Sequence, residues 1–372
     1  MKKDNTIEAF FALIRGGLWE KEVSLSQFGE LDYERILRLA EEQSVVGLVA
    51  AGLEHVADVK VPKEVVLQFV GQALQLEQQN KAMNSFVAKL VSRMRDNGIY
   101  TLLLKGQGIA QCYERPLWRS CGDVDFFLSD ENYLKAKEYL IPLATNIEPE
   151  GKYEKHLGMT IEQWEVELHG TLRSGLSRRI DEGLDKVRNS VFFGGEVRSW
   201  VNDGTQIFLP SAENDAVYVF THILQHFFKG GIGLRQVCDW CRLLWTYRDS
   251  LKCDELKRHL HKMGLIAEWK AFGAFAVGYL GMASERMPFY ASDKKWCRKA
   301  DKICSFILEV GNFGHNRDMS YYGKKPYFIR KMISLRLRIG DLFRHASIFP
   351  MDSIRFFPSL LFNGLRSAAN GE

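Results

Sequence analysis

Three short stretches between Tyr100 and His169 decide the fold. They read Tyr100-Thr-Leu-Leu-Leu-Lys105-Gly-Gln-Gly108, Arg119-Ser-Cys-Gly-Asp123-Val-Asp125-Phe-Phe-Leu128 and Trp164-Glu-Val-Glu167-Leu-His169. Short apolar or alternating runs of this kind are typical of β-strands. We predict a strand that breaks at Lys-Gly, a short helical turn, and two further strands that carry three carboxylates.

The second stretch places two aspartates on one face of a strand. Side chains alternate along a strand, so Asp123 and Asp125 point one way while Val124 and Phe126 point into a core. Two carboxylates on one face repel each other unless a cation lies between them. Oxygen ligands favour Mg²⁺, and Mn²⁺ is the alternative.

The third stretch supplies the remaining carboxylate. Glu165, Glu167 and His169 share the face opposite Val166 and Leu168. If this strand lies beside the first, Glu167 completes a set with the two aspartates. Two metal ions about 3.5–4 Å apart then clamp the attacking and leaving oxygens of an in-line displacement.

Lys105-Gly106-Gln107-Gly108 is the candidate phosphate end of the site. Glycine lets the backbone approach a ligand closely, and a helix starting nearby directs N–H groups at an anion. The Lys105 side chain leaves the core at the strand end. Taken singly, each motif also fits an ordinary turn, strand end or surface position, whereas the ordered set favours a site.

These motifs resemble the uncharacterised nucleotidyltransferase family within the polymerase-beta-like superfamily. The resemblance runs from about Asp32 to Leu244, and the Lys-Gly form is that of the narrower family. Gln107 replaces a usual small residue, and the gap to Asp123 is longer than usual. The resemblance implies the following roles: metal binding and catalysis by Asp123, Asp125 and Glu167; nucleotide binding by Lys105, Gly106, Gln107, Gly108 and Arg119; and substrate contacts by His169 and Arg235.

The pattern along the chain predicts an α+β fold. A small mixed sheet near 99–209 should be preceded and followed by helices, including a long helix over 63–97 ended by Gly98. Gly194-Gly195 indicates a hairpin. We divide the chain into an N-terminal helical region (1–97), a catalytic core (98–210), a helical domain (211–319) and a basic C-terminal segment (320–372).

The helical domain contains two weaker signals. His222 and His226 are four residues apart, which suits metal ligands, but their neighbours look like core. Arg235 and Asp239 have the spacing of a helical ion pair. The resemblance places these residues on the wall of the cleft opposite the sheet, and an ordinary exposed pair is the alternative.

The composition is typical of a globular protein without disulfides or membrane-spanning helices. The chain has 372 residues, a net charge of +4 and seven cysteines, whose odd number suits a reducing cytoplasm. Cys238 and Cys241 lack the second pair that would complete a zinc site. The start is too short for a secretory signal, and no apolar run is long enough for a transmembrane helix.

The segment from Ser320 carries nine Lys and Arg against three Asp and Glu, a formal charge of +6. A polyanion-binding surface, an anionic membrane face and a helix packed on the acidic body all remain open, and we favour the last.

Two functions fit the sequence. The first is transfer of an NMP from an NTP to an acceptor hydroxyl on a small molecule, protein or RNA, with Mg²⁺ or Mn²⁺. The second is a non-catalytic module that keeps the fold and binds a nucleotide, RNA or protein. The three carboxylates favour the enzyme.

Overall fold

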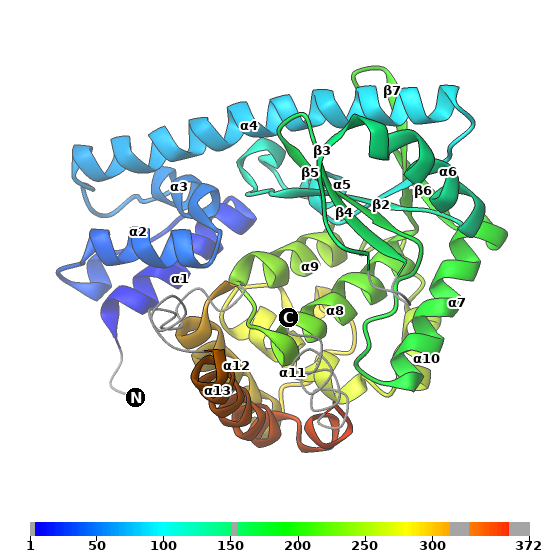
Figure 1. The fold of residues 1–372 in the computed structure, drawn as a ribbon. Coiled ribbons are helices and arrows are strands. Elements are labelled where there is room, and N and C mark those ends of the chain that lie inside the picture. Colours follow the sequence, from blue (N-terminus) through cyan, green and yellow to red (C-terminus); the bar gives the residue numbers. More distant parts are fainter. Residues whose placement is uncertain (1–3, 151–154, 313–326, 357–372) are drawn as a thin grey trace.

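The computed structural model describes residues 4–150, 155–312 and 327–356. It begins with four helices, of which α4 is the long one that leads into the sheet (Figure 1): α1 Asn5–Trp19, α2 Tyr33–Glu42, α3 Val46–Glu54 and α4 Lys63–Asp96. Asp4 and Asp32 cap α1 and α2 by accepting hydrogen bonds from free N–H groups. Gly98 follows α4 at φ +70°, so the expected helix and its end are confirmed.

A seven-stranded mixed sheet follows, in the order β3-β4-β5-β2-β1-β7-β6. Its strands are β1 Leu102–Leu104, β2 Asp123–Phe127, β3 Ala144–Ile147, β4 His156–Ile161, β5 Trp164–His169, β6 Val197–Asn202 and β7 Thr205–Pro210. β1 pairs with β7, and β2 with β5, in parallel; the other neighbours are antiparallel. The expected α+β class, with helices before and after a mixed sheet, is confirmed.

The two faces of the sheet have different environments. One face packs under the second half of α4 and under α6 (Asp130–Leu140), where Phe86, Val124, Phe126 and Val166 share a core. The other face carries Asp123, Asp125 and Glu167 and looks toward the helical part of the molecule. Side chains along β2 and β5 therefore alternate between the two faces as expected, with the apolar ones on the covered face and the carboxylates on the other.

The Gly194-Gly195 hairpin prediction is wrong. This stretch ends α7 (Arg178–Gly194), and Gly195 adopts φ +68° as the left-handed C-cap. The hairpin lies further on, where β6 and β7 join at Asp203-Gly204, both with positive φ. Asp-Gly is a favoured two-residue turn because both positions tolerate that conformation.

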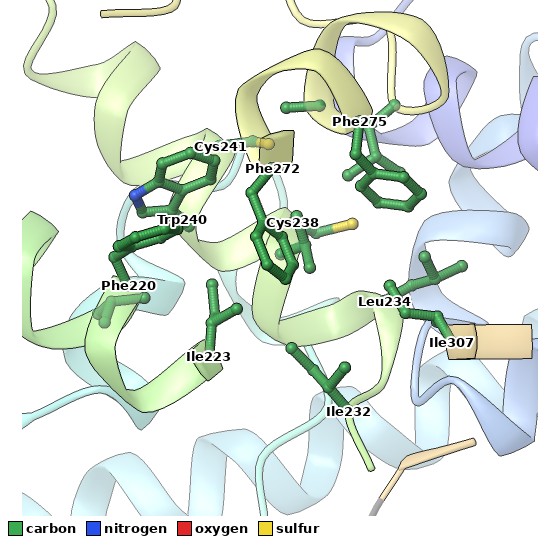
Figure 2. Packing of buried hydrophobic residues seen from close by; sticks show 14 of the residues in the cluster. Phe220, Ile223, Ile232, Leu234, Cys238, Trp240, Cys241, Phe272, Phe275 and Ile307 are labelled. Carbon is green, nitrogen blue, oxygen red and sulfur yellow. The ribbon is translucent and has the colours of Figure 1, made fainter. Parts of the chain in front are cut away.

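The helices after the sheet share one core with α1 and α3. They are α8 Ala212–Lys229, α9 Leu234–Thr246, α10 Cys253–Met263, α11 Ile266–Gly278, α12 Lys294–Val310 and α13 Tyr327–Ile348. Figure 2 shows Phe220 and Trp240 packed beside each other in this core. Their ring centroids are 5.2 Å apart. Cys238 and Cys241 are buried there, and burial raises the pKa of both thiols, so this pair has the character of core residues.

Short 3₁₀ and α turns connect these elements. They are η1 Ser26–Phe28, α5 Gly106–Ala110, η2 Pro116–Trp118, η3 Ile141–Leu143 and η4 Ser284–Arg286.

The described part of the basic C-terminal segment packs on the helical body. His345 and Phe349 are buried against aromatic rings of α8, and Arg344 forms an ion pair with Glu309 at 3.1 Å. This agrees with the interpretation that we favoured for the segment. The basic residues of this segment at 320–326 and 357–372 lie outside the described residues, so polyanion contact there stays a prediction.

Candidate active site

Parallel pairing of β2 with β5 assembles the carboxylates. Asp125 lies directly opposite Glu167, and Asp123 opposite Glu165. Asp123, Asp125 and Glu167 each offer an oxygen, and these oxygens lie within 4.8 Å of one another. The structure therefore brings the three predicted residues together on the open face of the sheet.

Lys105 reaches into this cluster, which argues against the alternative that it is an ordinary solvated strand end. Its Nζ is 3.0 Å from Asp125 Oδ1, and the two side chains are 15% and 1% exposed. The backbone at Lys105 and Gly106 has φ of +47° and +39°, which bends the chain sharply after β1. Glycine tolerates such a conformation, whereas a β-branched residue at position 106 would be strained.

Charge in the cluster is poorly balanced without a further cation. The neighbouring charge of Asp125, together with burial, raises the pKa of Asp123. Burial opposes the charged form of Lys105, but the negative charge of Asp125 outweighs it and raises the pKa of the ammonium. The three carboxylates of Asp123, Asp125 and Glu167 form an oxygen donor set that suits Mg²⁺ or Mn²⁺.

Two histidines flank Glu167. His169 Nε2 is 2.8 Å from Asp125 Oδ1 and 3.2 Å from Glu167 Oε2, while His156 Nε2 is 3.0 Å from the same Glu167 oxygen. Burial works against the ionised form of Glu167, yet hydrogen bonds from His156 and His169 lower its pKa well below the usual range. Burial likewise opposes protonation of His169, but its hydrogen bonds to Asp125 and Glu167 raise the pKa of the imidazole.

Helix α8 forms the opposite wall. His222 Nε2 is 3.2 Å from Lys105 Nζ and 3.1 Å from His226 Nε2. Burial and the nearby positive charge of Lys105 lower the pKa of His222, and the same causes lower that of His226 to about 4. Both rings are therefore neutral at neutral pH.

The resemblance implied that His222 and His226 lie on this wall, and both line the cleft, although their apolar neighbours made metal ligation a weak expectation. The signal was present: four polar residues recur at the spacing of one helical face, His222, Gln225, His226 and Lys229, and all of them line the cleft. Tyr218 extends the same face by one turn. His156 was missed, because it begins a strand whose partner cannot be inferred from its own sequence.

The expected helical ion pair between Arg235 and Asp239 is absent. Asp239 instead receives two hydrogen bonds from Arg119, at 2.8 and 2.7 Å, and one from the Tyr113 hydroxyl at 2.8 Å. Arg235 donates to the carbonyl of Ser120 at 2.7 Å. A planar guanidinium matches both oxygens of a carboxylate, so the long-range pair displaces the local one.

Gln107 and Gly108 turn toward the protein interior. The Gln107 amide donates to Asn80 Oδ1 at 2.9 Å, and Asn80 donates to the carbonyls of Leu117 and Arg119. A Cβ on Gly108 would lie 2.4 Å from Leu209, so this glycine permits close packing of α5 on β7. Any contact that these two residues make with a nucleotide would use main-chain N–H groups, and that role stays a prediction.

The open face of the sheet and helices α8 and α9 enclose a cleft of about 830 Å³. The remaining predicted residues, Lys105, Gly106, Arg119, His169 and Arg235, line it with the three carboxylates. Basic side chains that sequence reasoning did not select stand at its rim: Lys155, Arg173, Arg188 and Lys229. A second cavity of about 490 Å³ lies on the other side of Asp123 and Glu167 and also contains Arg235. This space and its mixed charge suit a polar, phosphate-bearing ligand.

No helix in the described part of the chain combines the length and the apolar composition needed to cross a membrane.

Comparison with known proteins gives one family. No curated protein matches the chain. A crystal structure of an antigenic nucleotidyltransferase-like protein from Paracoccidioides brasiliensis aligns with a TM-score of 0.32 and 13% identity, over 54% of this chain and 92% of the other. The family model described as uncharacterised nucleotidyltransferase matches residues 29–275. That span includes every candidate site residue named above, and the chain belongs to the uncharacterised nucleotidyltransferase family.

Proposed function

We propose that the protein is a metal-dependent nucleotidyltransferase that moves an NMP from an NTP to an acceptor hydroxyl. One observation carries the proposal: Asp125 and Glu167 face each other across paired parallel strands, with Asp123 on the same face and Lys105 3.0 Å from Asp125. This is the arrangement that the resemblance to the polymerase-beta-like superfamily implies. The family match supports the same reaction class.

The metal site fits the residues present. The carboxylate oxygens lie within 4.8 Å of one another, and the raised pKa of Asp123 reflects repulsion by Asp125 that a cation would relieve. Asp123, Asp125 and Glu167 would hold Mg²⁺ or Mn²⁺. When bound, the metal supplies neutralisation of phosphate charge and activation of the attacking oxygen.

The chain's own residues position the reactants. The acceptor oxygen forms a bond to the α-phosphorus while the bond to the bridging oxygen breaks, so the NMP stays on the acceptor and pyrophosphate leaves. Lys105, which projects into the cleft beside Asp125, neutralises charge on the pyrophosphate side. Glu167 accepts the hydrogen bond of the attacking hydroxyl, and the hydroxyl proton is released to solvent as the bond to phosphorus forms.

Arg235 is the best-placed residue for a second contact with substrate. Its Nη1 donates to Ser120, while its Nε is buried and makes no hydrogen bond within the described residues. It lines both cavities that meet at Asp123. A buried donor without a partner costs free energy until a ligand satisfies it, so Arg235 fits a phosphate or acceptor oxygen.

The experiment follows radiolabel from each α-³²P NTP into acceptors of a cell extract, with Mg²⁺ or Mn²⁺. We expect labelled product and equal release of pyrophosphate with the wild type, and loss of both with Asp125→Asn. The matched control is Asp130→Asn, since Asp130 lines the same cleft but its side chain is 62% exposed. Nucleotide binding without transfer in every extract fraction would contradict the enzyme and favour the non-catalytic module.

A further inference from the structure

Two histidine rings and one carboxylate converge outside the aspartate pair. His156 and His169 are direct cross-strand neighbours on β4 and β5, with ring centroids 4.8 Å apart. Both Nε2 atoms approach the same Glu167 oxygen, at 3.0 and 3.2 Å. The three donor atoms lie within 4.8 Å of one another.

The two nitrogen–oxygen separations are close to the edge of a metal coordination shell. A tetrahedral ion with bonds of about 2.0–2.1 Å to its ligands holds neighbouring donors about 3.3–3.4 Å apart. Only small side-chain rotations are therefore needed to admit an ion between Glu167 and the two rings. The ion would take the place of the protons that the rings now share with the carboxylate.

We propose that His156, His169 and Glu167 form a second metal site, selective for a transition metal such as Zn²⁺, Mn²⁺ or Co²⁺ over Mg²⁺. Imidazole nitrogen suits these ions, whereas Mg²⁺ takes oxygen ligands. Glu167 is shared with the aspartate pair, so it bridges an oxygen-only position and a nitrogen-containing position. Three protein ligands leave a coordination position open toward the cleft for water or a phosphate oxygen.

The site is accessible to an ion from solvent. The His156 side chain is 39% exposed, that of Glu167 30% and that of His169 12%. The alternative is that both rings act only as hydrogen-bond donors that orient Glu167 and Asp125. The two interpretations differ in one measurable property: only a metal site binds a nitrogen-preferring cation in a way that depends on both rings.

Co²⁺ titration followed by visible absorption tests the proposal. The visible absorption band of bound Co²⁺ reports nitrogen ligation and a low coordination number, whereas Mg²⁺ has no visible absorption. The protein carries Cys253→Ser and Cys297→Ser, since these two thiols are exposed and thiolates bind soft metals. We expect one nitrogen-ligated Co²⁺ per chain, displaced by Zn²⁺ but not by a large excess of Mg²⁺.

His156→Asn and His169→Asn should each weaken Co²⁺ binding at least about a hundredfold, because loss of a residue that merely supports a ligand already costs about 10–100-fold. His261→Asn removes an exposed histidine on α10 and should leave binding unchanged. Thermal melts show that each variant is folded; if His169→Asn fails to fold, the more exposed His156→Asn decides alone.

Unchanged Co²⁺ affinity in His156→Asn, or complete displacement by Mg²⁺, would overturn the proposal. The titration contains no nucleotide, so its outcome is separate from that of the transfer assay. Failure of NMP transfer with intact, histidine-dependent Co²⁺ binding rejects the proposed function alone. Loss of the Co²⁺ site with intact Mg²⁺-dependent transfer rejects the second metal site alone.

Discussion

Lys105→Met removes the only ammonium that the described structure places against the three carboxylates, and keeps a side chain of similar length. Lys105 Nζ lies 3.0 Å from Asp125 Oδ1, in a pair that is 15% and 1% exposed. In wild type this contact offsets the repulsion that raises the pKa of Asp123. The variant therefore leaves a buried negative cluster in which, among the described residues, the imidazole of His169 remains as the side-chain hydrogen-bonding partner of Asp125.

The structure sets the size of the effect. Breaking a buried ion pair by removing one partner costs about 3–5 kcal/mol, and the cleft exposes Lys105 enough that we take the lower end. A chain of 372 residues has an unfolding entropy on the order of 0.8 kcal/mol/K. A loss of about 3 kcal/mol then lowers Tm by roughly 4 °C in metal-free buffer.

Metal should reverse this loss. In wild type an incoming cation competes with the Lys105 ammonium for Asp125, whereas in Lys105→Met it meets three carboxylates with no competitor. Because binding only the folded state contributes about 2.7 kcal/mol at a ligand concentration a hundred times Kd, the variant should gain more from a given Mg²⁺ concentration than wild type. Calorimetric melts with EDTA and with a series of Mg²⁺ concentrations measure both quantities.

The matched control is Lys155→Met in the same cleft. Lys155 pairs with Asp130 at 2.5 Å, but the side chains are 52% and 62% exposed, so the change should cost less than about 1 kcal/mol and leave the Mg²⁺ response unchanged. Equal metal-free stability of Lys105→Met and wild type would refute the buried-pair argument. A Mg²⁺-induced rise in the Tm of Lys105→Met no larger than that of wild type would refute the idea that the Lys105 ammonium and the metal compete for Asp125.

Three further outcomes follow from the same geometry. Asp123→Asn should be at least as stable as wild type in EDTA, because the charge of Asp125 disfavours the ionised form of Asp123. The variant should nevertheless lose most of the Mg²⁺-induced rise in Tm. A rise as large as that of wild type would show that Asp123 is not a metal ligand. His226→Gln should reduce the loss of stability between about pH 6.5 and 4. The folded pKa of His226, about 4, lies below the ordinary 6.5, so the unfolded chain binds the proton first and this residue costs wild type up to about 3 kcal/mol as pH falls, while His222 keeps its own contribution. Unchanged chemical-denaturation profiles would contradict this. Gly108→Val should lower the free energy of unfolding by about 1–3 kcal/mol, because its side chain would overpack against Leu209. The affinities for Co²⁺ and Mg²⁺ should stay unchanged, and altered metal binding would argue that this glycine serves the site directly.

The sequence by itself determined the local features. Alternation along β2 and β5 assigned Asp123 and Glu167 to faces opposite Val124 and Val166, because side-chain direction in a strand depends only on position. The length of α4 and its end at Gly98 were readable for the same reason: helical periodicity and a left-handed cap are properties of neighbouring residues.

Only the tertiary structure decided which elements meet. Parallel pairing of β2 with β5 sets Asp125 opposite Glu167, and α8 brings His222 to 3.2 Å from Lys105 across 117 positions of sequence. Arg119 takes Asp239 from its helical neighbour Arg235 because a bidentate contact between distant segments is stronger than a local pair on a helix surface. Contacts between distant segments depend on how sheet and helices pack, and packing energy is shared among many residues, so no single stretch of sequence encodes it.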